Sequence, residues 1–286
     1  MIILDLNQVM ISNMMMQLNH SDDVEEDLVR HMILNSIRMY KQKFGAEYGE
    51  LIIACDDKNY WRKDIFPYYK AHRKEDRKAS THDWNKIFEC LNKIRDELKE
   101  TFPYKVIQVD RAEADDIIGV LAKKFGSYLN NGSTEKILIL SGDKDFGQLQ
   151  KYFNVEQYSP VLKKWIRVPD PHRFLREHIM KGDRGDGIPN FLSDDSTIIN
   201  KTRQKPLASK KLEGWVDLEP ETFCSTEMLR NYKRNESLVD LEKVPDSIAD
   251  EILNKYDNYV VPKRNGLLNY FIKNKLKNLM ENIGDF

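Results

Sequence analysis

Short apolar runs alternate along the first part of the chain with longer stretches in which apolar residues follow helical spacing. The apolar runs lie at residues 1–6, 51–55, 105–109 and 137–140. Unbroken runs of this length are typical of strands that are covered on both faces. The stretches between them predict helices over residues 24–44, 80–100 and 113–126. Because strand–helix–strand order favours parallel neighbouring strands, we expect an α/β fold with a mostly parallel central sheet and helices on both faces.

The pattern changes in the second half of the chain. Residues 155–158 and 165–168 predict a short hairpin, and Asp170-Pro171 predicts the start of a helix that runs to Gly182. Strand patterns end after about residue 190, and the remaining apolar spacing predicts helices over residues 222–241, 245–259 and 265–282. We therefore expect a domain at residues 1–190 and a helical C-terminal region at residues 191–286.

Composition narrows the class of protein. Of the 286 residues, 41% are hydrophobic and 32% are charged, and no apolar run approaches the ~20 residues of a membrane span. The N-terminus begins directly in a predicted strand without a cationic leader. Three scattered cysteines fit a reducing compartment and argue against a disulfide framework. We expect a cytoplasmic, monomeric protein that does not bind membranes.

Acidic residues gather where the predicted strands end. The candidates are Asp5, Asp56, Glu113, Asp115, Asp116, Asp143 and Asp145, followed by Asp183 and Asp186 in a glycine-rich turn. At the second strand, Asp57 is an alternative to Asp56, which we prefer. Each could merely cap a helix or start a turn, but the carboxyl ends of parallel strands meet at one edge of a sheet. Carboxylates brought together there would repel one another unless divalent cations compensate them.

The donor atoms in this set predict which cations would bind. All are carboxylate oxygens, without histidine or cysteine, so we expect Mg²⁺, with Mn²⁺ as a substitute, and not Zn²⁺. Two such ions ~4 Å apart can stabilise both the attacking and the leaving oxygen of a phosphodiester.

Basic residues are concentrated in two segments. Residues 62–78 carry seven Lys or Arg against three acids, with aromatic residues among them, and residues 201–211 carry five bases and no acid. Solvated loops often look like this. Cations beside aromatic rings also suit a nucleic acid, because they contact phosphates while the rings stack on unpaired bases.

An acidic metal cleft beside basic, aromatic segments indicates a metal-dependent nuclease. Two alternatives remain: a PIN-type ribonuclease acting on single-stranded RNA, and a non-catalytic protein that binds particular nucleic-acid structures. A PIN-type ribonuclease should lack the long basic insertion between the second and third strands. A non-catalytic binding protein would not require intact carboxylates in every motif. A metal-dependent phosphatase is a weaker possibility, since it would need little basic surface.

The same motifs resemble those of the flap endonuclease/5′ nuclease family. The resemblance covers most of the chain and is most specific in AEADD at residues 112–116, in SGDKDFGQL and in KGDRGDGIP. It implies a PIN-like α/β domain with a helical arch at about residues 57–104, and two metal sites. Asp5, Asp56, Glu113, Asp115, Asp143 and Asp145 resemble ligands or neighbours of the first site. Asp183, Asp186 and Asp116 resemble the second site and its surroundings.

The resemblance also implies roles for the basic residues. Lys70 and Arg73 match catalytic positions in the arch, and Tyr69 matches the aromatic residue next to the arch lysine. Candidate nucleic-acid contacts are Arg62, Tyr69, Lys70, Arg73, Lys201, Arg203, Lys205, Lys210 and Lys211. The implied activity is a 5′→3′ exonuclease and flap endonuclease that removes RNA primers in replication, acting on RNA–DNA and on flapped or nicked DNA duplexes.

Two further points follow from the resemblance. A single-strand-binding protein and a sliding clamp are family-level expectations as partners, which no motif here identifies. The glycine-rich hairpin with which the family grips duplex DNA is replaced by residues 190–211, and Gly187 stands where an Asn is usual. We therefore expect a largely electrostatic grip.

Overall fold

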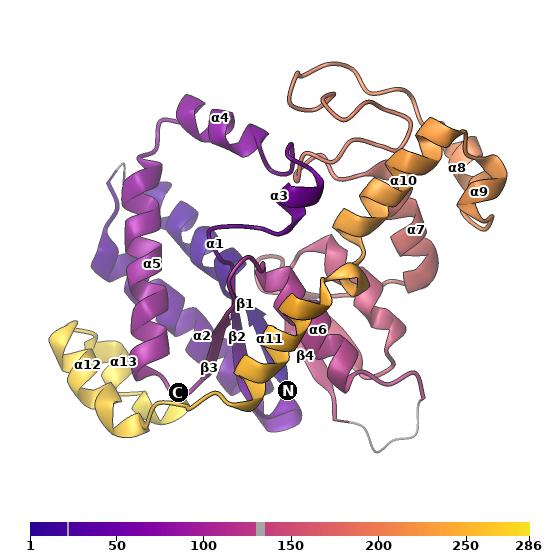
Figure 1. Ribbon diagram of the computed structural model, residues 1–286. Helices are drawn as coiled ribbons and strands as arrows, with labels where there is room; N and C mark the ends of the chain where they lie inside the picture. Colours follow the sequence, from indigo (N-terminus) through magenta and orange to yellow (C-terminus); the bar gives the residue numbers. More distant parts are fainter. Residues whose placement is uncertain (22, 130–134) are drawn as a thin grey trace.

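The protein was analysed as a computed structural model that describes residues 1–21, 23–129 and 135–286 (Figure 1). Within these residues, six strands form one sheet in the order β3-β2-β1-β4-β5-β6. The strands are β1 (Ile2–Asp5), β2 (Leu51–Cys55), β3 (Lys105–Gln108), β4 (Ile137–Leu140), β5 (Val155–Ser159) and β6 (Lys164–Ile166). β1 to β5 pair in parallel, and β6 pairs with β5 antiparallel. The predicted mostly parallel sheet and the 155–168 hairpin are both confirmed.

Helices cover both faces of the sheet, which explains the unbroken apolar runs. Successive side chains of a strand point to opposite faces, so Leu4 belongs to one core and Ile3 to the other, and both are fully buried. The first face is covered by α1 (Leu6–Leu18), α2 (Glu26–Tyr48) and α5 (Trp84–Thr101). The second is covered by α6 (Ala114–Phe125) and α11 (Asp246–Asp257).

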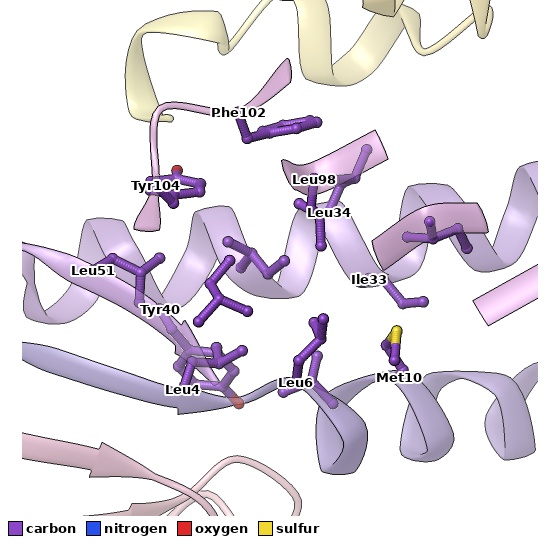
Figure 2. Packing of buried hydrophobic residues seen from close by; sticks show 14 of the residues in the cluster. Leu4, Leu6, Met10, Ile33, Leu34, Tyr40, Leu51, Leu98, Phe102 and Tyr104 are labelled. Carbon is purple, nitrogen blue, oxygen red and sulfur yellow. The ribbon is translucent and has the colours of Figure 1, made fainter. Parts of the chain in front are cut away.

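Figure 2 shows how the first face is closed. Leu6 and Met10 on α1 point toward Ile33 and Leu34 on α2. Phe102, at the end of α5, packs edge-to-face against Phe271 at 6.1 Å between ring centroids. Phe271 lies in α12 (Leu267–Lys273), which is followed by α13 (Lys277–Met280). The C-terminal region thus completes the core of the sheet domain.

The remaining elements form two groups. Those toward the carboxyl edge of the sheet are α3 (Arg62–Ile65), α4 (His72–Ala79), η1 (Lys144–Lys151), α7 (Pro171–Lys181), α8 (Ser209–Trp215), α9 (Pro220–Phe223), α10 (Thr226–Val239) and η2 (Leu241–Lys243). η3 (Arg264–Gly266) packs against α12, and η4 (Ile283–Asp285) packs against α2. α3 and α4 form the arch segment, and α4 stands away from the sheet in Figure 1. Phe66 and Tyr69, at its base, share a third core cluster with residues of α7, α8 and α10.

Several predicted boundaries were wrong. α1 was not predicted, and of the methionines in it Met14 is buried while Met16 is 55% exposed. α5 begins at Trp84 and not at Ser80, because Asp83 is the cap and accepts hydrogen bonds from the amides of residues 85 and 86, both at 3.1 Å. Ser225 caps α10 and so splits the predicted 222–241 helix, while Lys275, at φ 54°, separates α12 from α13.

The division at residue 190 stays a prediction, since residues after it contribute to all three core clusters. Among the described residues, no helix is long and apolar enough to cross a lipid bilayer.

Candidate active site

Four carboxylates meet at the carboxyl edge of the sheet because they follow three neighbouring parallel strands and open one helix. Asp5 ends β1, and its side chain accepts from the Gln8 amide at 3.1 Å and caps α1. Asp56 follows β2 and accepts from the Ala114 amide at 2.7 Å, at the first turn of α6. Asp115 lies in that same turn, and Asp143 follows β4. The fold therefore places together side chains that are far apart in the sequence.

These side chains line a cleft of about 1020 Å³ between the sheet edge, α1 and the arch. Six predicted acids contribute to its lining: Asp5, Asp56, Glu113, Asp115, Asp143 and Asp186. Lys70 and Arg73 line it as well, so the cleft brings the predicted bases to the predicted acids. Asp57 also touches the cleft, but it accepts from the amides of Asn59 in its own loop and of Arg111 in the loop after β3. Asp56 therefore remains the better candidate ligand.

Crowding and burial oppose ionisation of these acids. Burial, with the nearby charge of Glu113, raises the pKa of Asp56 to about 7. Burial, with the charge of Asp145, raises the pKa of Asp143 to about 6. The pKa of Asp115 is raised well above its usual range by burial and by the charge of Asp143. Such a group of oxygen donors fits divalent cations, which would favour the ionised forms.

Glu113 is an exception, because basic side chains of the protein already compensate its negative charge. Lys70 Nζ donates to Glu113 Oε1, and Arg62 Nη1 and the Tyr69 hydroxyl donate to Oε2 at 2.9 and 2.8 Å. Burial would raise the pKa of Glu113, but the charges of Lys70 and Arg62 outweigh it and lower that pKa. Glu113 thus holds the arch base against the cleft.

Arg62 and Tyr69 were predicted to contact nucleic acid, and their burial contradicts this. Each side chain is only 2% exposed. Besides Glu113, Arg62 contacts the Leu238 carbonyl at 2.8 Å and Asp116 Oδ1 at 2.8 Å. Sequence could not show this, since a basic segment does not reveal which of its bases turns inward.

Asp116, predicted as a ligand or neighbour of the second metal site, lies outside the cleft. Its side chain is fully buried, and Asp116 Oδ2 accepts from Trp61 Nε1 at 3.0 Å and from the Glu113 amide at 2.8 Å. The amide contact completes a capping box with Glu113 at the start of α6. Asp116 therefore orients Glu113 and Arg62 and is not placed to bind an ion in the cleft.

Lys70 and Arg73 contact the glycine-rich turn. The Lys70 amide donates to the Asp186 carbonyl at 2.7 Å, and Lys70 Nζ lies 3.6 Å from Asp186 Oδ2. Arg73 Nη2 donates to Asp186 Oδ1 at 2.6 Å, and Arg73 Nε donates to the Gly185 carbonyl at 3.0 Å. Lys70 has φ 53°, a left-handed conformation that costs free energy in a non-glycine residue and that is often found at functional sites.

A second group of possible metal ligands lies next to the cleft, and one of its members, His178, was not predicted from the sequence. Asp145, Asp183 and His178 place ligand atoms within 4.8 Å of one another. His178 Nε2 lies 2.9 Å from Asp145 Oδ1 and 3.7 Å from Asp183 Oδ2. The sequence offered one clue to His178: it lies near the end of a predicted helix, five residues before Asp183. The predicted all-oxygen donor set thus gains a nitrogen donor nearby.

Basic and aromatic residues also line the cleft. Arg77, Trp84, Phe88 and Arg95 line it, and the Arg77 guanidinium lies 5.5 Å from the centre of the Phe88 ring. Apart from Arg77, which belongs to the basic segment, these residues were not singled out, because helical spacing alone does not show that Trp84 and Phe88 line a cleft. They share one cleft with the acids.

The second basic segment lies at the surface. Lys201, Arg203, Lys205, Lys210 and Lys211 are all exposed. The segment is tied to its surroundings: the Lys205 amide donates to Ser193 Oγ at 2.8 Å, and Asn190 Nδ2 donates to the Lys205 carbonyl at 2.9 Å. Lys201 Nζ lies 3.9 Å from Glu75 on α4, so the segment reaches the arch. Its nucleic-acid contacts stay a prediction.

Residues 2–177 match the family model for the N-terminal, resolvase-like domain of 5′-3′ exonucleases. The chain belongs to this family. Residues 174–286 match the model of the T4 RNase H C-terminal domain. The exonuclease is 35% identical over 294 aligned positions to the ribonuclease H of Enterobacteria phage T4, covering 99% of this chain and 95% of that protein.

Further relatives agree. A flap endonuclease Xni from Shewanella sp. (strain MR-4) is 29% identical over 49% of this chain and 51% of its own length. Among solved structures, the T5 D15 protein co-crystallised with metal ions aligns with TM-score 0.60 at 17% identity, over 89% of this chain and 98% of its own. A D15 flap endonuclease structure with DNA and metal ions gives TM-score 0.59 at 18% identity, over 90% and 99%. The exonuclease is therefore a nuclease of the 5′-3′ exonuclease and flap endonuclease type, with the predicted PIN-like fold.

Proposed function

We propose that this exonuclease uses two divalent cations, Mg²⁺ or in its place Mn²⁺, to hydrolyse phosphodiesters at 5′ ends and 5′ flaps. Its substrates are RNA–DNA hybrids and flapped or nicked DNA duplexes, and its role is the removal of RNA primers in replication. The observation that carries the proposal is the convergence of Asp5, Asp56, Asp115 and Asp143 on one cleft, where the pKa values of all four are raised. Because a full-length relative is a phage protein, we place the reaction in the cytoplasm of a bacterial host.

The donor chemistry supports two groups of ligands. Asp5, Asp56, Asp115 and Asp143 would hold the first cation, and Asp145, Asp183 and Asp186 would contribute to the second. Bound there, divalent cations lower the pKa of a water nucleophile and stabilise charge on the phosphate. The proposed ligands are oxygen atoms, which suits the hard cation Mg²⁺.

Lys70 supplies a fixed positive charge beside these acids. Burial alone would lower its pKa, but the charges of Glu113 and Asp186 outweigh burial and raise it, so the ammonium group stays protonated at neutral pH. Arg73 is more exposed, at 43%, and its guanidinium can turn from Asp186 toward a phosphate. We assign to both the stabilisation of negative charge that develops on the scissile phosphate.

The rest of the cleft suits a nucleic acid better than a small molecule. Its lining includes both cations and aromatic rings, which suits an unpaired strand. The exposed bases at residues 201–211 suit the phosphates of a duplex. This combination favours a 5′ nuclease over a small-molecule phosphatase.

Cleavage of defined substrates tests the proposal. Labelled 5′-flap, nicked and RNA–DNA duplexes, incubated with Mg²⁺ or with EDTA, should be cut from the 5′ side only with the cation. Asp143→Asn should bind the same substrates and fail to cut them. Cleavage of single-stranded RNA alone would favour the PIN-type ribonuclease, and tight binding without cleavage in Mg²⁺ or Mn²⁺ would favour the non-catalytic alternative.

A further inference from the structure

His178 lies near the C-terminal end of α7, on the buried side of the helix, beside two acids of the second group. Its side chain is 5% exposed, and its ring stacks on Phe174 at 6.0 Å between centroids, which fixes the direction in which Nε2 points. Nε2 faces Asp145 Oδ1 at 2.9 Å and Asp183 Oδ2 at 3.7 Å. The acids come from the turn after β4 and the turn after α7, so three separate positions in the fold converge.

His178 Nε2 and Asp145 Oδ1 lie at ion-pair distance, but their geometry is not that of a hydrogen bond. Both His178 Nε2 and Asp145 Oδ1 are buried without a partner of hydrogen-bonding geometry, although they lie 2.9 Å apart. A buried polar atom without a partner costs free energy and calls for an explanation. Two donor atoms that share one cation explain it, because neighbouring ligands of an octahedral ion with bonds of about 2.1 Å lie about 3 Å apart.

The other groups around Nε2 are consistent with this role. Asp183 Oδ1 accepts from the Gly185 amide at 2.7 Å, which leaves Oδ2 facing His178 and Lys144. Lys144 Nζ lies 2.9 Å from Asp183 Oδ2 and its side chain is 56% exposed, so it can move into solvent when a cation binds.

We propose that His178 Nε2 is a nitrogen ligand of the second divalent cation, together with Asp145 and Asp183, and that it makes this site select Mn²⁺ over Mg²⁺. Imidazole suits transition metals, whereas Mg²⁺ strongly prefers oxygen. The inference rests on the proposed two-cation function and deepens it: the first site keeps only oxygen donors, and the second gains a donor that discriminates between metals.

Pulsed electron paramagnetic resonance of the Mn²⁺-loaded protein tests this directly. Wild type should show coupling of Mn²⁺ to ¹⁴N, and His178→Gln should lose it while keeping Mn²⁺ at the first site. Calorimetric titration should show that the weaker site of His178→Gln loses Mn²⁺ affinity by about ten- to a hundredfold or more, a range that outer residues of metal sites already reach. Its Mg²⁺ affinity should change much less.

Two controls make the outcome unambiguous. His172→Gln removes an exposed imidazole from the same helix, and His72→Gln removes the imidazole near Gly187; both should keep the ¹⁴N coupling. The wild-type spectrum decides even where His178→Gln is unstable. Mn²⁺ bound at two sites without ¹⁴N coupling, or equal Mn²⁺ affinities in wild type and His178→Gln, would overturn this inference and leave the proposed function standing. Failure of any Mn²⁺ or Mg²⁺ to bind would overturn the proposed function as well.

Discussion

Lys70 and Asp186 are joined twice, once through the backbone and once through their side chains. The Lys70 amide donates to the Asp186 carbonyl at 2.7 Å, and the ammonium group lies 3.6 Å from the Asp186 carboxylate. Gly187, at φ 78°, allows the approach, since a Cβ there would lie 3.0 Å from the Tyr68 carbonyl. The base of the arch is thereby fixed to the turn that carries two predicted metal ligands.

Replacing Lys70 should slow the chemical step more than it weakens substrate binding. Loss of one charge-stabilising donor typically costs about 10² in rate. We expect Lys70→Ala to lower single-turnover cleavage of a 5′-flap duplex by about 10²-fold, and Lys74→Ala, an exposed base on α4, to change it little. A defect confined to KM, with a normal single-turnover rate, would show that Lys70 contributes attraction only.

Replacing Arg62 should act through stability and not through nucleic-acid contact. Removing one partner of a buried ion pair leaves the other charge uncompensated, at a cost of about 3–5 kcal/mol. Arg62→Met should lower the free energy of unfolding in urea by roughly that amount, because Glu113 and Asp116 both lose a partner. Lys63→Met, which removes the exposed neighbouring base, is the matched control. Unchanged stability with a reduced salt dependence of binding would restore the surface role that the sequence suggested.

The sheet and the acidic edge could be predicted because both depend on local patterns. Unbroken apolar runs identify buried strands, and parallel order brings the acids after β1, β2 and β4 to one edge. α1 escaped prediction because half of its apolar residues are methionines among amide residues, and because Asp5 alone looks like the start of a turn. In fact Asp5 caps that helix and lines the cleft at once.

Side-chain direction could not be predicted in the same way. Arg62 and Tyr69 differ from their exposed neighbours Lys63 and Tyr68 only in which way α3 and the following turn present them to the third core cluster. His178 meets Asp145 only because α7 packs against η1, a contact between segments that no local pattern links. Local patterns thus predicted the acids, whereas tertiary packing determined their partners.

Stability without divalent cations should fall as the pH rises from about 4 to about 7. The pKa values of Asp56 and Asp143 are about 7 and about 6 in the folded protein, against an ordinary value near 4. The folded state therefore binds more protons than the unfolded state in this window, and each proton lost on raising the pH destabilises it. Urea unfolding in EDTA at pH 5 and pH 7.5 should show this slope, and Mg²⁺ or Mn²⁺ should oppose it.

Asp143→Asn should remove part of that slope. At pH 7.5 in EDTA the variant should be more stable than wild type by about 1–3 kcal/mol, since a repelling charge is gone. Asp250→Asn, which neutralises an exposed acid on α11, should leave the slope intact. If the stability of Asp143→Asn fell with pH as steeply as that of wild type, the charge of Asp143 would not destabilise the folded protein.

Lys210→Ala with Lys211→Ala should flatten the salt dependence of duplex binding. Each phosphate contact releases condensed counterions, so two lost contacts should reduce the slope of log K against log salt by up to about 2. Cleavage of bound substrate should stay nearly unchanged. Lys273→Ala with Lys277→Ala removes the same charge from α12 and α13, which lie on the other side of the molecule in Figure 1, and should keep the slope. Equal slopes in both double variants would mean that residues 201–211 are only a solvated surface.

The packing of Phe102 against Phe271 also bears on the order in which the protein can fold during synthesis. The ribosome releases α5 and the whole sheet before α12 emerges. The part of the first core around Phe102 therefore stays uncovered while the last part of the chain is made. A fragment of residues 1–190 should keep that face open, bind a hydrophobic dye more strongly than the full chain and aggregate at lower concentration. All residues that line the acidic cleft thus leave the ribosome before the residues that close the first core, and a chaperone that shields apolar surface would act in that interval.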